Sequence, residues 1–409
     1  MGRDDTVRRA DSATSQDAAN PAVVKFVEVH TGDTEGALPG PDRTPKAIGQ
    51  TLAALLDAGM FTSNETDVKI AVVVPCFKVS RQVLDVIARI GPECSRIYVV
   101  DDCCPERSGD LVSERCRDPR VTVLRHSENE GVGGAVMSGY LAAERDGATV
   151  IVKIDGDGQM APELLPFFVA PILRGTADYT KGNRFFDPEA VRAMPLVRLM
   201  GNAALSFMAK LSCGYWDSFD PTNGYTAIHA KLVAHLPWDR ISRRYFFESD
   251  VLFRLNTLRA VVVDVPMEAR YGDEVSSLKV STVLPEFFAK HLRNTFKRIF
   301  YNYFLRDFST ATLSLIVGLL LLGFGLVFGS TQWLAAVRSG TASSAGTVML
   351  AALPTLSGLQ LLLAFLNYDI ASTPRYPIHP SLGASAGWEL SKERRETLGE
   401  PRYSKRGFP

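Results

Sequence analysis

The fold class of this chain is clearest from residues 150–159, which are Val-Ile-Val-Lys-Ile-Asp-Gly-Asp-Gly-Gln. The first half is β-branched and mostly apolar, which predicts a buried strand, and the second half is a Gly-rich turn. The turn brings together the carboxylates of Asp155 and Asp157 and the amide of Gln159. Oxygen ligands of this kind suit Mg²⁺ or Mn²⁺, so we expect these three residues to hold one of these ions.

A calcium-binding loop and an ordinary solvated turn are the alternatives for this acidic segment. A helix–loop–helix calcium loop ends in a Glu at its twelfth position, where this chain has Pro166, so the calcium loop is excluded. The solvated turn stays open as long as the turn is considered alone.

Strands and helices alternate on both sides of the acidic turn. Apolar runs predict strands at 70–74, 96–100, 121–124, 149–154 and 260–263, and apolar spacing predicts helices at 83–90 and 134–145. Because hairpin turns are missing between the early strands, the connections must cross over the sheet. We therefore predict an α/β fold with a mostly parallel sheet that is covered on both faces.

Polar segments fall where the predicted strands end, which is where such sheets bind ligands. The first strand ends at Pro75, and the second ends at Asp101 and Asp102. Residues 129–135, Asn-Glu-Gly-Val-Gly-Gly-Ala, lead into a helix but match neither a dinucleotide fingerprint nor a P-loop. At a helix N-terminus, glycines such as Gly131 would let the backbone approach a ligand closely.

In this order the segments resemble family 2 glycosyltransferases of the GT-A fold, over about residues 69–280. They are most similar to the polyprenyl-phosphate sugar synthases, such as the dolichol-phosphate mannose synthases and the bacterial undecaprenyl-phosphate glycosyltransferases. The resemblance implies a Rossmann-like GT-A domain at 67–280. It also implies inverting transfer of a hexose from a UDP- or GDP-sugar to polyprenyl phosphate, and the capacity to form a homo-oligomer.

The resemblance also implies roles for single residues. Pro75 and Asp102 would border the nucleoside pocket. Asp155, Asp157 and Gln159 would hold the metal on the donor diphosphate. Arg184 would face the lipid phosphate, and Asp220, the first residue of the segment 220–225, would lie beside the reacting centre. The other residues expected to bind substrate are Gly131, Asp155, Arg198, Glu248, Asp250, Arg270, Ser276 and Lys279.

The chain departs from the family pattern at two places. The flap motif Arg-x-x-Gly-x-Ser-Lys is present only with altered spacing, as Arg270, Gly272, Ser276 and Lys279, and Arg198 stands where a Ser is expected. A phosphate-monoester acceptor is already largely dianionic at neutral pH, so it needs cationic positioning more than a general base. The candidates for that positioning are Arg184, Arg192, Arg198, Arg270 and Lys279.

The C-terminal part predicts a membrane hairpin. Residues 308–329 and 347–367 carry no charged side chain and are each long enough to cross the hydrocarbon layer. A buried core helix is the alternative for each run. Lys and Arg cluster before the first run, so the positive-inside rule places the catalytic domain, both termini and the tail at 368–409 in the cytoplasm.

Just before the first run, residues 284–306 predict an amphipathic juxtamembrane helix. Its apolar face is Phe288, Leu292, Phe296, Ile299, Phe300 and Tyr303, and basic residues occupy much of the rest. Such a helix suits the headgroup plane of a membrane. The alternative is a helix packed on a soluble domain.

The composition narrows the classes of function further. The chain has 409 residues, with 45 Lys and Arg against 45 Asp and Glu, so its formal net charge is zero. A nucleic-acid-binding protein would carry a basic domain or stripe, so we expect no nucleic-acid partner. Residues 1–66 are polar with scattered Pro and Gly, and we expect a partly disordered leader there.

Two alternative functions stay open at this stage. A membrane-bound family 2 glycosyltransferase could act on another lipid or on a polysaccharide, although the Gln/Arg-x-x-Arg-Trp motif of processive polymerases is missing from the sequence. A degenerate transferase domain could instead serve as a non-catalytic membrane scaffold, and the complete Asp-Gly-Asp-Gly-Gln at 155–159 argues against that.

Overall fold

The computed structural model describes residues 68–186, 196–267 and 280–383. The expected leader at 1–66 lies outside these residues, as do Arg192, Arg270, Ser276, Lys279 and the tail after Gly383.

The described residues form a seven-stranded sheet in the order β3-β2-β1-β4-β6-β5-β7. Strand β6 is antiparallel to β4 and β5, and the other neighbours are parallel, so the predicted mostly parallel α/β sheet is confirmed. All strands predicted from the sequence are present, and β5 and β6 are additional. The strands are β1 (Ile70–Cys76), β2 (Cys94–Asp101), β3 (Val121–Arg125), β4 (Val150–Lys153), β5 (Tyr179–Asn183), β6 (Thr226–His229) and β7 (Val262–Pro266).

The strand order reverses beside β1. The chain runs outward from β1 to β2 and β3 and then returns to β4 on the other side of β1. Hydrogen bonds tie the ends of these strands together, from the Ile154 amide to the Val73 carbonyl at 3.0 Å and from the Asp102 amide to the Cys76 carbonyl at 3.1 Å. Ligands of open α/β sheets bind at such a switch point, outside the carboxyl ends of the strands.

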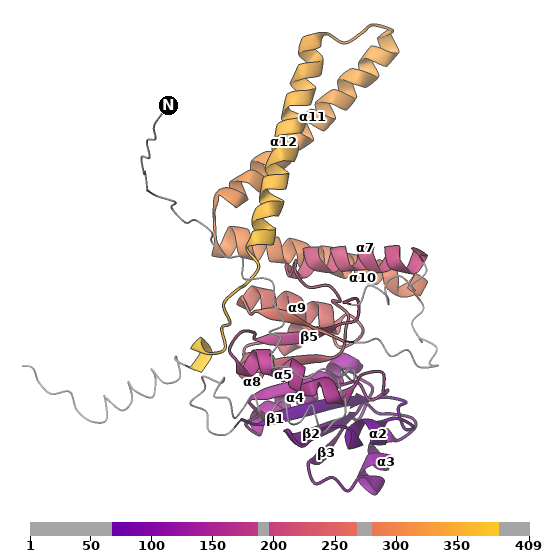
Figure 1. Cartoon of the computed structure of the whole chain (residues 1–409). Helices are drawn as coiled ribbons and strands as arrows, with labels where there is room; N and C mark the ends of the chain where they lie inside the picture. Colours follow the sequence, from indigo (N-terminus) through magenta and orange to yellow (C-terminus); the bar gives the residue numbers. More distant parts are fainter. Residues whose placement is uncertain (1–67, 187–195, 268–279, 384–409) are drawn as a thin grey trace, which may run out of the picture. The chain divides into compact units, whose positions relative to one another are not determined.

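Helices cover both faces of the sheet (Figure 1). Successive side chains of a strand point to opposite faces, so Val72 and Val74 join one buried cluster and Ala71 and Val73 join the other. The first cluster includes residues of α2 (Val83–Ala88), α3 (Ser108–Arg115) and α5 (Leu165–Leu173), and the second includes residues of α4 (Val132–Arg145), α8 (Ala230–Val233) and α9 (Phe247–Leu258). Short 3₁₀ turns lie at η1 (Pro162–Leu164), η2 (Trp238–Arg240) and η4 (Ser381–Gly383).

Two further helices, α7 (Leu196–Cys213) and α10 (Val280–Phe300), pack side by side (Figure 1). The π-helical turn η3 (Tyr301–Arg306) continues α10, so the helix predicted at 284–306 is present but changes its winding at residue 301. Three polar side chains of α10 are buried and four large apolar side chains are exposed, the reverse of a core helix. The buried residues are His291, Asn294 and Arg298, and the exposed residues are Phe288, Leu292, Phe296 and Phe300.

Within the described residues, two helices are long and apolar enough to cross a membrane, and they pack against each other as a hairpin (Figure 1). They are α11 (Thr310–Ser339) and α12 (Ala345–Ala371), and both extend beyond the runs predicted at 308–329 and 347–367. Residues 330–339 contain no Gly or Pro that would end the helix, so α11 continues until the left-handed Gly340, and Ser344 caps α12.

Candidate active site

The acidic turn follows β4 at the switch point. Oδ1 of Asp155 is buried and lies 3.0 Å from Nζ of Lys153, yet it accepts no well-directed hydrogen bond from the described residues. The side chain of Asp155 is 28% exposed, and because Oδ1 is buried, this exposure belongs to its other atoms. One side of the carboxylate therefore faces the protein, and the other side is accessible to a ligand.

Lys153 is fully buried under this turn and was not recognised as a site residue from the sequence. Its ammonium lies 2.9 Å from Oε1 of Glu248, the second residue of α9, and so bridges Glu248 and Asp155. Burial alone would lower the pKa of Lys153, but the two carboxylates outweigh burial and hold this pKa above its ordinary value. Lys153 is therefore charged and fixes the position of both carboxylates. Its sequence signal was a lysine within the apolar run that ends at Ile154.

Asp157 and Gln159 complete the turn and are half-buried. Oδ1 of Asp157 accepts a 3.0 Å hydrogen bond from the backbone amide of Gln159, which shapes the turn locally. Gly224, in the loop before β6, faces the same turn: a Cβ at this position would lie 2.5 Å from Oδ2 of Asp155. Only glycine therefore lets the 220–225 loop approach the acidic turn this closely.

The donor set of this turn fits a divalent ion that is shared with a bound diphosphate. Within the described ranges, no group of three or more His, Cys, Asp and Glu side chains could hold a metal ion by itself. Asp155 and Asp157 offer hard carboxylate oxygens, and the side of Asp155 that faces away from Lys153 is accessible. Mg²⁺ is commonly held by one or two carboxylates together with substrate phosphates, and this arrangement matches that pattern.

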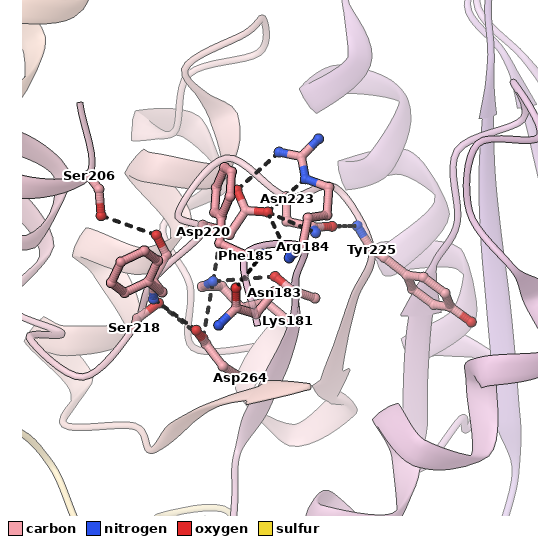
Figure 2. Close-up of polar contacts among 12 residues, drawn as sticks. Lys181, Asn183, Arg184, Phe185, Ser206, Ser218, Asp220, Asn223, Tyr225 and Asp264 are labelled. Carbon is pink, nitrogen blue, oxygen red and sulfur yellow. Dashed lines mark hydrogen bonds and ion pairs between the residues drawn. The ribbon is translucent and has the colours of Figure 1, made fainter. Parts of the chain in front are cut away.

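A second polar cluster joins the end of β5 to the 218–225 loop (Figure 2). The guanidinium of Arg184 forms two hydrogen bonds with the carboxylate of Asp220, at 2.7 and 3.0 Å. Asn223 adds a 3.2 Å hydrogen bond to the same carboxylate, and Asp220 itself is 1% exposed. The Arg184 side chain is 34% exposed, so in this pair the arginine faces outward and Asp220 holds it in place.

Lys181 in β5 holds the loop that carries Asp220, and this role was not predicted from the sequence. Its buried ammonium donates a 2.8 Å hydrogen bond to the backbone carbonyl of Asp220 and lies 3.1 Å from the carboxylate of Asp264 in β7. Asp264 in turn accepts hydrogen bonds from Ser218 and from the Phe219 amide (Figure 2). The loop before Asp220 is thus anchored to both β5 and β7.

Asp102 and Gly131 also lie together. The buried carboxylate of Asp102 accepts 2.8 Å hydrogen bonds from the amides of Glu130 and Gly131 and from Nδ1 of His126. A Cβ on Gly131 would lie 2.7 Å from the carbonyl oxygen of Arg243, so the close backbone approach expected here is made to the chain itself. Asp102 therefore orients the Gly-rich loop at the start of α4.

The other predicted site residues are spread over several elements. Pro75 pairs with Val100 near the end of β1, beside the switch point. Asp250 is 1% exposed and accepts hydrogen bonds from the Ser242 amide and the Asn294 side chain, so it fastens α10 to α9. Arg198 lies in α7, and its side chain is outside the described part of the structure, as are Arg270, Ser276 and Lys279.

The strand order, with an acidic turn after β4 at the switch point, agrees with the GT-A fold that the sequence predicts. Residues 71–236 match the family model "Glycosyl transferase family 2". The undecaprenyl-phosphate mannosyltransferase of Micrococcus luteus is 33% identical over 175 residues, which are 42% of this chain and 71% of the relative. The chain belongs to glycosyl transferase family 2, and it is an enzyme of the glycosyltransferase class.

Two further proteins are similar to this chain. The UDP-N-acetylglucosamine–dolichyl-phosphate N-acetylglucosaminyltransferase of Methanococcus voltae is 26% identical over 221 residues, covering 51% of this chain and 88% of the relative. The structure of glucosyl-3-phosphoglycerate synthase from Mycobacterium tuberculosis with Mn²⁺ and UDP is 19% identical, with a TM-score of 0.42 over 64% of this chain and 86% of that one. Both relatives are named as transferases of a polyprenyl-type lipid phosphate, which agrees with the resemblance seen in the sequence.

Proposed function

We propose that this protein is an inverting transferase that moves a hexose from a nucleoside diphosphate sugar to polyprenyl phosphate. The main support is a chain of contacts that links the anionic turn at Asp155 to the cationic side chain of Arg184. Gly224 packs on Asp155, Asn223 binds Asp220, and Asp220 binds Arg184. A metal–diphosphate on one side and a phosphate acceptor on the other would meet across this loop.

Asp155 and Asp157, with Gln159, would hold the divalent ion, Mg²⁺ or Mn²⁺, on the donor diphosphate. When bound, the ion acts as a Lewis acid that stabilises charge on the departing nucleoside diphosphate. Lys153 and Glu248 fix the orientation of Asp155. Pro75, and Gly131 on the loop that Asp102 orients, would border the nucleoside.

Arg184 would position the acceptor phosphate, with its guanidinium pre-oriented by Asp220. The phosphate dianion can attack without losing a proton, so its reaction needs no general base. Both Asp220 and Glu248 are engaged in ion pairs, with Arg184 and Lys153. A hydroxyl acceptor would require one of these carboxylates to leave its pair, which favours a phosphate acceptor over a polysaccharide.

Membrane association agrees with the two apolar helices and with the polyprenyl-phosphate enzymes among the relatives. We propose that α11 and α12 span the bilayer, that α10 lies at its surface, and that the catalytic domain and both termini face the cytoplasm. The exposed side chains of Phe288, Leu292, Phe296 and Phe300 on α10 support this placement. Assembly into a homo-oligomer stays a prediction, which the mass of the detergent-solubilised protein tests.

A competition assay tests the acceptor class. Purified protein is given a panel of UDP- and GDP-sugars with Mn²⁺, together with polyprenyl phosphate, diacylglycerol and an oligosaccharide acceptor in equal amounts. The proposal expects label in the polyprenyl product. Transfer to diacylglycerol or to the oligosaccharide, with none to polyprenyl phosphate, would overturn the acceptor assignment and leave the family unchanged.

A further inference from the structure

A buried ion pair joins the hairpin to α10, the helix that packs on α7 of the catalytic domain. Asp369, near the end of α12, is 3% exposed, and its two oxygens lie 2.6 and 2.9 Å from the guanidinium of Arg298 on α10. The hydroxyl of Tyr303 donates to the same carboxylate at 2.6 Å, and the indole of Trp216 donates at 2.9 Å. Side chains from α10, η3 and the segment after α7 therefore converge on one residue of the hairpin.

Arg298 also reaches the end of α7. Its Nε and one terminal nitrogen donate to the carbonyl oxygen of Leu211, at 3.2 and 3.0 Å. Burial alone would lower the pKa of Arg298, but the hydrogen bonds and charge of Asp369 raise it above its ordinary value. The guanidinium thus stays charged while it is 2% exposed, and each of its three nitrogens is occupied.

The chain is tied down a second time just after α12. Asp178, which is fully buried before β5, accepts hydrogen bonds from the amides of Ile378 and His379 and from Nδ1 of His379, at 2.8 to 3.0 Å. The His379 ring stacks on His229 with 4.3 Å between centroids. The segment 372–379 therefore returns to the catalytic domain. The C-terminal end of α12 is held at two places, by Asp369 within the helix and by Ile378 and His379 after it.

Stability alone does not account for Arg298 and Asp369. Taking two charges out of water costs so much that a well-packed apolar pair is often equally stable or more stable. A bidentate pair instead fixes direction, because the planar fork accepts a carboxylate in one orientation. In the sequence of α10, the buried Arg298 stands between the exposed Phe296 and Phe300, so fixing Arg298 also fixes the rotation of α10 and the direction of that apolar face.

We propose that Arg298 and Asp369 are positioning residues that form a joint between the catalytic domain and the hairpin. The joint sets the height at which Arg184 meets a phosphate that emerges from the bilayer. The claim about the height of Arg184 rests on the proposed function. The claim that the joint holds the hairpin rests only on the contacts described above.

The test uses the double variant Arg298→Met/Asp369→Asn in the full-length protein. This variant removes both charges together, so no unpaired buried charge is left to unfold the domain. The matched control is Asp239→Asn/Arg240→Met, which removes an exposed ion pair of the catalytic domain. Hydrogen exchange in lipid nanodiscs should rise in α10 after residue 298 and in residues 369–379, with β1 and β4 unchanged. Unchanged hydrogen exchange both in α10 after residue 298 and in residues 369–379 would refute the proposed joint.

Kinetics test the consequence for the acceptor. With polyprenyl phosphate in the nanodisc, the double variant should raise the acceptor KM by about tenfold or more, because small displacements of a positioned group are costly. With a water-soluble short-chain isoprenyl phosphate, KM should equal that of the control variant. An equal loss with both acceptors would contradict the positioning role. If the unmodified protein used neither acceptor, the proposed function would fall, and the exchange experiment would still decide whether the joint exists.

Discussion

Lys153 offers a sharp test of how the acidic turn is built. Its ammonium is 1% exposed and lies about midway between Asp155 and Glu248, at 3.0 and 2.9 Å. Lys153→Met keeps most of the side-chain length but removes the charge. Two carboxylates would then face each other beneath the turn without the cation between them.

The expected loss follows from the burial of this ammonium. Removing one partner of a buried ion pair costs about 3–5 kcal/mol, because the remaining charge is left uncompensated. For a domain of about 150–250 residues, 1 kcal/mol shifts the unfolding temperature by about 2–4 °C. We therefore expect Lys153→Met to unfold about 6–20 °C lower than the unmodified protein.

The second variant, Lys153→Met/Glu248→Gln, separates charge from packing. It replaces the ion pair with two neutral side chains, which is often neutral for stability, so most of the loss should be recovered. The assay is thermal unfolding of the full-length protein in detergent, followed by intrinsic fluorescence. A single variant that unfolds within about 2 °C of the unmodified protein, less than about 1 kcal/mol, would refute the argument. So would a double variant no more stable than the single one.

Three further results are expected. Arg184→Lys loses the two-point contact with Asp220, so initial rates should show an acceptor KM raised by about tenfold or more with an unchanged donor KM; equal acceptor KM values would count against the phosphate role. Burial lowers the pKa of His291 from 6.5 to about 4, so the folded protein keeps this imidazole neutral. The unfolded chain takes up a proton first as the pH falls, so the folded state is most stable above pH 6.5 and loses stability between pH 6.5 and 4. The unfolding free energy should fall by up to about 3 kcal/mol over that range, and His291→Gln should flatten the curve; a variant with the same slope would refute this assignment. Asp157→Asn weakens a proposed metal ligand, so turnover should fall by about a hundredfold or more with no change in unfolding temperature; full activity would exclude Asp157 as a ligand.

Local sequence patterns were sufficient for the first half of the sheet. Strands β1 and β4 are rich in β-branched residues and buried on both faces, so their apolar runs are easy to recognise, and β2 and the partly buried edge strand β3 keep shorter apolar runs. Strand β5 was missed because three of its five residues, Thr180, Lys181 and Asn183, are polar yet buried. The burial of Lys181 depends on Asp264 and on the 218–225 loop, which no pattern within the strand can indicate.

The same limit applies to the candidate site. The acidic turn and Arg184 were named from motifs, but the pairing of Arg184 with Asp220 joins residues 36 positions apart. Lys153 meets Glu248 across 95 positions, and Arg298 meets Asp369 across 71. Such pairs carry no local signal beyond a charged residue in an apolar context, and only the fold brings them together.

The most direct test of the central claim is a metal-dependent transfer assay on the full-length protein in nanodiscs that contain polyprenyl phosphate. Labelled UDP- and GDP-sugars are added with Mn²⁺ or with a chelator, and the lipid extract is treated with mild acid. The account predicts a labelled lipid that forms only with the metal and releases its sugar in mild acid, as a sugar phosphodiester does. Equal labelling in the presence of the chelator, or label found only in free sugar or in polymer, would contradict it.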